Sequence, residues 1–142
     1  MEWTDNLNKA VQYIEEHIKE EIDYEIVASI ACCSLSKFQR LFTFMADTPV
    51  SDYVRYRKMT LAAKELMIGE SKIIDLALDF GYESPEAFTR AYQNFHGVPP
   101  SVSRKLGIYN KYDRVTFQIN IQGGHVRMGT KPNITVVNIF KM

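Results

Sequence analysis

The stretch IIDLALDFGYESPEAFTRAYQNF, residues 73–95, decides the fold. Its first half places apolar residues at helical spacing, and Gly81 suits the left-handed backbone of a tight turn. Ser84 is a good N-cap, Pro85 fits the first helical position, and Glu86 adds an acid in the first turn. The stretch therefore predicts a short helix, a tight turn and a second helix, which together form a helix-turn-helix.

The same order occurs earlier, in IVASIACCSLSKFQRLFTF, residues 26–44. Here Ser34 or Ser36 is the expected cap of the second helix. Between the two stretches, residues 49–68 predict one unbroken helix, whose ~20 residues span ~30 Å at 1.5 Å per residue. Consecutive major-groove faces on one side of DNA are ~34 Å apart, so this spacer is long enough to hold two recognition helices one DNA turn apart.

We therefore expect a mainly α fold with two homeodomain-like helix-turn-helix subdomains in tandem, joined by a long helix, and a short β-rich C-terminal tail. The expected DNA-binding domain covers residues 1–107. Within it, the first subdomain covers about residues 5–47, the linker helix residues 49–68, and the second subdomain about residues 71–106. An amphipathic helix with Asp5 as its N-cap opens the first subdomain.

Residues 108–142 are the β-prone tail. Apolar and polar residues alternate over 115–122, Gly123 and Gly124 suit a turn, and residues 135–140 are a further β-prone run, so we expect at most three strands. So few strands with one apolar face need a partner. The tail therefore pairs with the helical body, swaps between chains, or opens an effector domain that is incomplete here.

Charge is balanced in this chain. Its 142 residues include 17 basic and 17 acidic ones, and the pI is 6.8, without the basic excess usual in nucleic-acid-binding proteins. The acidic residues gather early, within residues 15–25. The basic residues in or beside the predicted recognition helices are Lys37, Arg40, Arg55, Arg57, Lys58, Lys64, Arg90, Arg104 and Lys105. A neutral total is thus compatible with a basic face.

The two cysteines, Cys32 and Cys33, are neighbours at the first predicted turn. A disulfide between them would be strained, and two cysteines do not make a stapled secreted scaffold. We expect both to be small buried residues at a crowded corner, with a metal site or redox sensor as the alternative. The three histidines, His17, His96 and His125, show no ligand spacing.

No catalytic constellation is evident. The chain has no Ser/His/Asp order, paired carboxylates, phosphate-binding loop or metal-ligand spacing, so we expect neither an enzyme nor a cofactor. Nor is there a signal peptide or an apolar run near the ~20 residues of a membrane span, so we expect a cytoplasmic protein without a membrane partner.

The outward faces of the two recognition helices carry groups suited to base edges. Gln39 suits adenine, and Arg40 suits guanine or a phosphate. In the second helix Glu86 can accept from cytosine, Ala87 can meet a thymine methyl group, and Arg90 can bind guanine or a phosphate. The alternative for either helix is a solvated polar face.

Several motifs together resemble the DNA-binding domain of the AraC/XylS family of bacterial transcription regulators, over roughly residues 7–105. They are Gln39-Arg40-Leu41-Phe42, Asp52-Tyr53-Val54-Arg55, Arg57-Lys58-Met59, Ile74-Asp75-Leu76-Ala77, Gly81-Tyr82-Glu83-Ser84-Pro85, Phe88-Thr89-Arg90 and Val98-Pro99-Pro100. The tail resembles the linker and first strands of the gyrase-inhibitor-like domain that follows in some members.

The resemblance implies an activator that binds an asymmetric promoter site in double-stranded DNA and helps recruit RNA polymerase. It implies that the first groove is contacted by Ser36, Lys37, Gln39 and Arg40, and the second by Pro85, Glu86, Ala87, Thr89 and Arg90. The cap serines, Ser34 and Ser84, complete the candidate DNA-binding set.

Sequence-specific recognition of two adjacent major grooves is thus the leading hypothesis. The alternative is a helical protein–protein interaction module derived from a DNA-binding domain. The two differ in salt dependence, since each neutralised phosphate contributes a log-log slope of about −0.9 to DNA affinity. A small-molecule effector is not expected, because the tail lacks the residues to enclose a pocket of a few hundred Å³.

Overall fold

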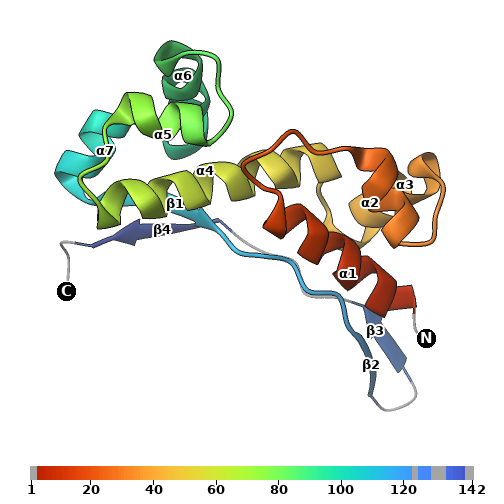
Figure 1. Ribbon diagram of the computed structural model, residues 1–142. Helices are drawn as coiled ribbons and strands as arrows, with labels where there is room; N and C mark the ends of the chain where they lie inside the picture. The colour runs from red at the N-terminus through yellow and green to blue at the C-terminus, as the bar shows by residue number, and fades with distance from the viewer. Residues whose placement is uncertain (1–2, 123–124, 129–133, 140–142) are drawn as a thin grey trace. The chain divides into compact units, whose positions relative to one another are not determined.

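A computed structural model describes residues 3–122, 125–128 and 134–139. The described helices are α1 (Trp3–Glu16), α2 (Tyr24–Ile30), α3 (Leu35–Ala46), α4 (Val50–Ile68), α5 (Ile73–Asp79), α6 (Pro85–His96) and α7 (Pro100–Leu106) (Figure 1). The described strands are β1 (Ile108–Tyr112), β2 (Ile119–Gln122), β3 (His125–Met128) and β4 (Ile134–Asn138). The mainly helical class expected from the sequence is confirmed.

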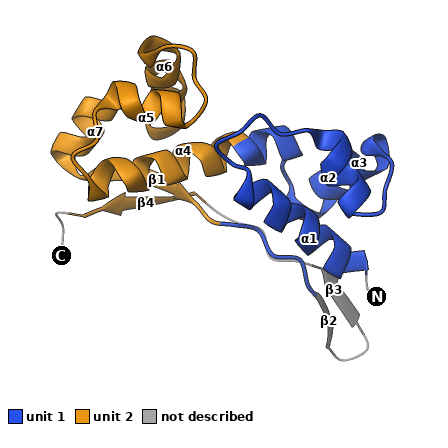
Figure 2. Ribbon diagram, viewed as in Figure 1, with its two compact units in different colours: residues 1–54, 114–132 blue, residues 55–113, 133–142 orange. Residues whose placement is uncertain are grey.

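The chain forms two compact units (Figure 2). Unit 1 comprises residues 1–54 and 114–132, and unit 2 comprises residues 55–113 and 133–142. Helix α4 therefore begins in unit 1 and continues in unit 2. The tail is also divided, because its middle belongs to unit 1 and its last part to unit 2.

Unit 1 has its core where α1, α2 and α3 meet. Phe42 is fully buried, and its ring contacts those of Phe38, Tyr53 and Phe117 at centroid distances of 5.9, 5.3 and 5.7 Å. Asp23 caps α2 as a side-chain acceptor for the Glu25 amide at 3.0 Å. The prediction that Asp5 caps the first helix is wrong: α1 already begins at Trp3, which places Asp5 inside its first turn.

Unit 2 has a separate core. The buried residues of this cluster are Met59, Ala62, Ala63, Leu66, Leu76, Ala77, Phe80, Phe88, Tyr92 and Tyr109. They come from α4, α5, α6 and β1, apart from Phe80, which is the C-cap of α5. Small residues in α4 and α5 allow these helices and α6 to approach closely, while the aromatic residues fill the space between them.

The two units repeat the same local hydrogen bonds at an offset of 50 residues. Ser34 and Ser84 are the N-caps of α3 and α6, and each of their carbonyls accepts from the amide four residues on, at 2.9 and 3.2 Å. Each helix ends on a left-handed residue, Asp47 (φ 60°) in unit 1 and Gly97 (φ 81°) in unit 2. The duplicated helix-turn-helix pattern is thus present in the backbone as well as in the sequence.

The turn before each recognition helix is also repeated. Gly81 has a φ of 82°, and the following amide of Tyr82 donates to the Ala77 carbonyl at 2.9 Å. In unit 1 Cys32 has a φ of 59°, and the following amide of Cys33 donates to the Ala28 carbonyl at 3.0 Å. Cys32 thus occupies the backbone position that glycine fills in unit 2.

The prediction that both cysteines are buried is wrong. Cys32 is exposed and Cys33 is half-buried. Both are free thiols. The turn is closed by the backbone amides of these residues, so packing of the two side chains is not needed to form it.

The tail pairs differently from the expected pattern. Strand β1, which was not predicted, pairs antiparallel with β4, with Ile108 opposite Asn138, and β2 pairs antiparallel with β3. The described residues therefore contain four strands, where at most three were expected. The predicted turn at Gly123 and Gly124, and the end of the last β-prone run at Phe140, lie outside the described residues.

Side chains of the helical body bind the tail along residues 112–117. Phe117 exchanges two bonds with the Asn8 amide, at 2.8 and 2.9 Å, and the Val115 amide donates to the Tyr53 hydroxyl at 3.1 Å. These bonds take the place of a strand ladder over the first part of the predicted strand. In unit 2, the Tyr112 amide donates to the Thr60 hydroxyl at 2.9 Å.

We predict that Gly97→Ala lowers the free energy of unfolding by about 1–2 kcal/mol, because a left-handed backbone is costly for a residue with a Cβ. Nothing lies within 4 Å of the added methyl group, so the cost is conformational. Gly69→Ala is the matched control, since Gly69 does not have a positive φ and the new Cβ meets the Ser71 hydroxyl at an ordinary 3.4 Å. Urea unfolding of both variants measures the difference, and an equal effect would contradict the argument.

Candidate nucleic-acid interface

Helix α3 buries one face and presents the other. Phe38 and Phe42 are fully buried one turn apart and fix the rotation of the helix about its axis. The candidate residues on its outer side, Lys37, Gln39 and Arg40, are exposed. The side chains predicted to meet the first groove therefore lie on one accessible surface.

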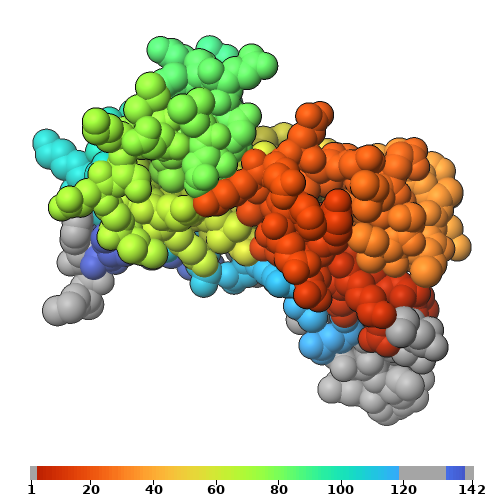
Figure 3. All heavy atoms as spheres, viewed as in Figure 1, coloured from red at the N-terminus to blue at the C-terminus, as the bar shows by residue number. Residues whose placement is uncertain are grey.

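Helix α6 has the same division. Phe88, Tyr92 and His96 are buried at intervals of four residues. Of the candidate residues, Glu86 and Arg90 are exposed, while Pro85, Ala87 and Thr89 are half-exposed. In the space-filling view the green atoms that include α6 lie at the surface of unit 2 (Figure 3). This surface carries a carboxylate and a guanidinium one turn apart.

The cap serines have a structural task. The Ser34 hydroxyl accepts from the Lys37 amide at 3.3 Å, and the Ser84 hydroxyl accepts from the Ala87 amide at 3.1 Å. Each hydroxyl keeps its own proton for donation to another acceptor. Ser36, the other cap considered, instead lies exposed in the first turn of α3.

Two basic residues assigned to the expected basic face, the buried Arg57 and the half-exposed Arg104, donate to main-chain carbonyls instead. Arg57 is buried, and its Nη1 donates to the Tyr112 carbonyl at 2.6 Å. Arg104 donates to the carbonyls of Leu66 and Ser71, at 3.2 and 2.6 Å. Both guanidinium groups satisfy main-chain carbonyls and so stabilise unit 2.

The recognition surfaces extend further than the predicted set. On α3, Thr43 and the 74% exposed Phe44 lie beside Gln39 and Arg40 around one shallow depression. On α6, the exposed Gln93 extends the surface that contains Glu86, Thr89 and Arg90. Thr43, Phe44 and Gln93 lie three or four residues from predicted contacts, and residues at this spacing share one face of a helix. This spacing could have identified them from the sequence.

Two residues on the buried side of α6, Tyr92 and His96, form side-chain hydrogen bonds. The Tyr92 hydroxyl lies 2.7 Å from the Ser103 hydroxyl, and burial raises the pKa of Tyr92 to about 12. The Nε2 of His96 donates to the Met59 carbonyl at 2.9 Å, and its Nδ1 accepts from the Asn110 amide at 2.9 Å. This pair of bonds requires the neutral Nε2–H tautomer of His96.

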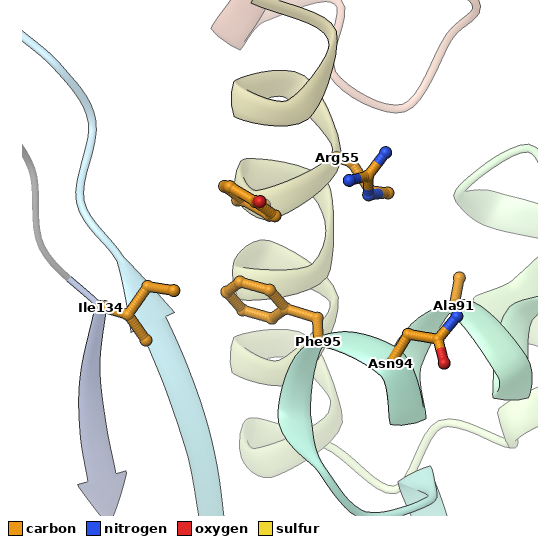
Figure 4. Close-up of a pocket in the computed structure, with 6 residues that line it drawn as sticks. Arg55, Ala91, Asn94, Phe95 and Ile134 are labelled. Carbon is orange, nitrogen blue, oxygen red and sulfur yellow. The ribbon is translucent and has the colours of Figure 1, made fainter. Parts of the chain in front are cut away.

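Unit 2 also has a hollow of about 500 Å³ between α4, α6 and β4. Its lining includes Arg55, Asn94, Phe95 and Ile134 (Figure 4). The rings of Tyr56 and Phe95 stack at 5.4 Å with an interplanar angle of 26°, and the Arg55 guanidinium lies 5.5 Å from the centre of the Tyr56 ring. This aromatic contact joins the recognition helix to α4.

The described part of the chain has neither a membrane-spanning helix nor a metal-binding cluster. None of its helices is both long and apolar enough to cross a membrane. Residues 3–122, 125–128 and 134–139 also contain no cluster of three or more His, Cys, Asp or Glu side chains that could hold a metal ion.

Comparison with known proteins identifies the family. The model of a family described as a helix-turn-helix domain matches residues 27–106. The regulatory protein SoxS of Escherichia coli is 34% identical over 91 residues, which are 64% of this chain and 85% of SoxS. The chain belongs to the AraC/XylS family of transcriptional regulators.

Two further proteins show the extent of the similarity. The helix-turn-helix-type transcriptional regulator YbfP of Bacillus subtilis is 34% identical over 98 residues, 69% of this chain, but the match spans only 33% of YbfP. A crystal structure of a transcriptional regulator from Chromobacterium violaceum, described as AraC-type, has a TM-score of 0.66 and 25% identity, covering 71% of this chain and 90% of that one. The tandem helix-turn-helix fold is therefore shared.

We predict that acid destabilises this AraC/XylS-type chain through His96. Burial lowers the pKa of His96 from 6.5 to about 4, with the Met59 bond acting in the opposite direction. The unfolded chain binds the proton more tightly, so the stabilisation is complete above pH 6.5 and is lost as pH falls towards 4. The loss amounts to at most about 3 kcal/mol, at about 1.4 kcal/mol per pKa unit.

The measurement is urea unfolding of the wild type and of His96→Gln at several pH values between 4 and 7. Carboxylates contribute to both proteins, so the difference between the two slopes reports on the histidine. Parallel slopes would show that His96 does not bind its proton differently in the folded and unfolded states.

Proposed function

We propose that this chain regulates transcription by binding a specific site in double-stranded DNA, with α3 in one major groove and α6 in the adjacent one. The observation that carries the proposal is the repeated construction of these helices. Each has a serine cap, a fully buried phenylalanine four residues later, and an arginine two residues beyond it on the exposed side. Arg40 and Arg90 thus occupy equivalent places in the two units.

Chemistry on the exposed faces suits base edges as well as phosphates. Gln39 can form two bonds with adenine, and Arg40 and Arg90 can each form two with guanine. Glu86 suits the amino group of cytosine but repels phosphates, which favours a contact inside the groove over one with the backbone. We infer that α3 supplies most of the electrostatic attraction through Lys37 and Arg40, and that α6 contributes more to base selection.

The alternative, an interaction module without specific DNA binding, is less well supported. A protein-binding helix face normally presents apolar anchors to its partner. On α6 the exposed surface instead carries Glu86, Arg90 and Gln93, and on α3 it carries Lys37, Gln39 and Arg40 beside the apolar Phe44. Both faces are thus mainly polar and charged.

The family supports further proposals about the cellular role. We place the protein in the bacterial cytoplasm, acting as an activator that recruits RNA polymerase after binding its promoter. It acts without catalysis, and without a cofactor or metal ion. The tail remains a candidate for the start of a gyrase-inhibitor-like effector domain.

We predict that a site selected from a randomised duplex pool contains two half-sites about one DNA turn apart. At this site Arg40→Ala and Arg90→Ala should each weaken binding by about 1–3 kcal/mol and relax the preference at one base position. Lys9→Ala is the control, because it removes the same charge from an exposed residue of α1. Affinity is measured with each single-base variant of the site at several salt concentrations.

The outcomes separate the possible roles. A uniform loss across all sequences would make that arginine a phosphate contact. Recovery of a single half-site would contradict the use of two grooves. Failure to select any site, together with an affinity that does not change with salt, would support the interaction module instead.

A further inference from the structure

Unit 1 contains an apolar hollow of about 410 Å³ beside the recognition helix α3. Its lining includes Trp3, Leu7, Cys32, Cys33, Lys37 and Leu41. Both cysteines of the chain are at this one place, together with its single tryptophan. The hollow therefore combines an indole ring and aliphatic side chains with two thiols and an ammonium group.

Cys32 is the accessible nucleophile of this hollow. Its side chain is exposed and its thiol is free. It occupies the left-handed position that Gly81 fills in unit 2, where a residue with a Cβ is strained. The fold therefore does not require a cysteine here, and glycine can replace it without loss of the turn.

We propose that this hollow is a modification site for apolar α,β-unsaturated carbonyl compounds, with Cys32 as the attacking thiol. The apolar body of the compound would lie against Trp3 and Leu41. In the reaction the sulfur forms a bond with the β carbon, the π electrons of the C=C bond move towards the carbonyl, and the thiol proton ends on the α carbon. No oxidant or further reactant is needed.

The other groups of the hollow suit this class of compound. The Lys37 ammonium is a donor for the carbonyl oxygen, which gains negative charge as the sulfur adds. Cys33, half-buried, completes the wall as a small polarizable group. A purely polar electrophile would gain nothing from Trp3, Leu7 and Leu41, so the site selects compounds with an apolar body.

Modification of Cys32 would alter the DNA-binding surface. This part of the inference rests on the proposed function. Cys32 is two residues before the cap of α3, and Lys37 both lines the hollow and belongs to the predicted contact set. An adduct that engages Lys37 removes one cation from the first groove's contacts. Occupation of the hollow should therefore weaken DNA binding.

The first test measures labelling in the absence of DNA. The full chain is treated with N-phenylmaleimide and, separately, with the polar N-(2-hydroxyethyl)maleimide, and the modified residue is located by mass spectrometry. We expect Cys32 to prefer the phenyl compound at least about tenfold more than N-acetylcysteine does, as expected from partial burial of a phenyl ring. Fluorescence of the single tryptophan should change with the same rate.

Three variants sharpen this test. Cys32→Gly should abolish the fast labelling, whereas Cys33→Ser should retain it. Trp3→Ala should reduce the phenyl preference, and because Trp3 is 38% exposed the fold should survive, as checked by thermal unfolding. A preference equal to that of N-acetylcysteine, or fast labelling of Cys33 in place of Cys32, would overturn the proposed site.

The second test uses the selected DNA site. The phenyl adduct should bind at least about tenfold more weakly than unlabelled protein, while Cys32→Gly treated in the same way should bind like the untreated wild type. Unchanged affinity of the adduct would overturn the link to DNA binding. If untreated protein selects no DNA site at all, the proposed function fails, and the labelling result still decides the modification site.

Discussion

Burial of one phenylalanine in each recognition helix is the constraint on which the other features depend. Phe38 and Phe88 are both fully buried four residues after a capping serine. The cap fixes where the helix begins, and the buried ring fixes its rotation. Together they determine that Arg40 and Arg90 are exposed. A shift of one residue in either cap would rotate the outer face by about 100° and direct other side chains outward.

The sequence was most informative where local chemistry alone determines the conformation. Gly81 favours a left-handed turn, Ser84 an N-cap and Pro85 the first position of a helix, and these preferences are compatible with one another. The structure has all three features as predicted. Contacts between distant residues were not predictable in this way. Arg57 lies in a helix rich in polar residues, and its bond to a carbonyl 55 residues later has no periodic signal. The predicted burial of Cys32 was wrong because a small residue at a turn can be either buried or exposed.

The neutral net charge is accompanied by the use of two arginines within the fold. The buried Arg57 and the half-exposed Arg104 donate to main-chain carbonyls of unit 2, so fewer cations are available to face outward than the sequence suggests. A surface with fewer outward-facing cations gains less from non-specific attraction to phosphates. Under the proposed function, discrimination between DNA sites would then come mainly from base contacts, and the carboxylate of Glu86 would strengthen that tendency.

The division of the tail has a consequence for the order of folding. Asn8 and Phe117, which exchange two hydrogen bonds, are 109 residues apart, and the chain returns to unit 1 only after it has passed through unit 2. Closing so long a loop is entropically costly and slow. During synthesis on the ribosome, the three N-terminal helices therefore emerge long before the segment that completes their core. Until then, the ring of Phe42 lacks one of its aromatic partners, Phe117.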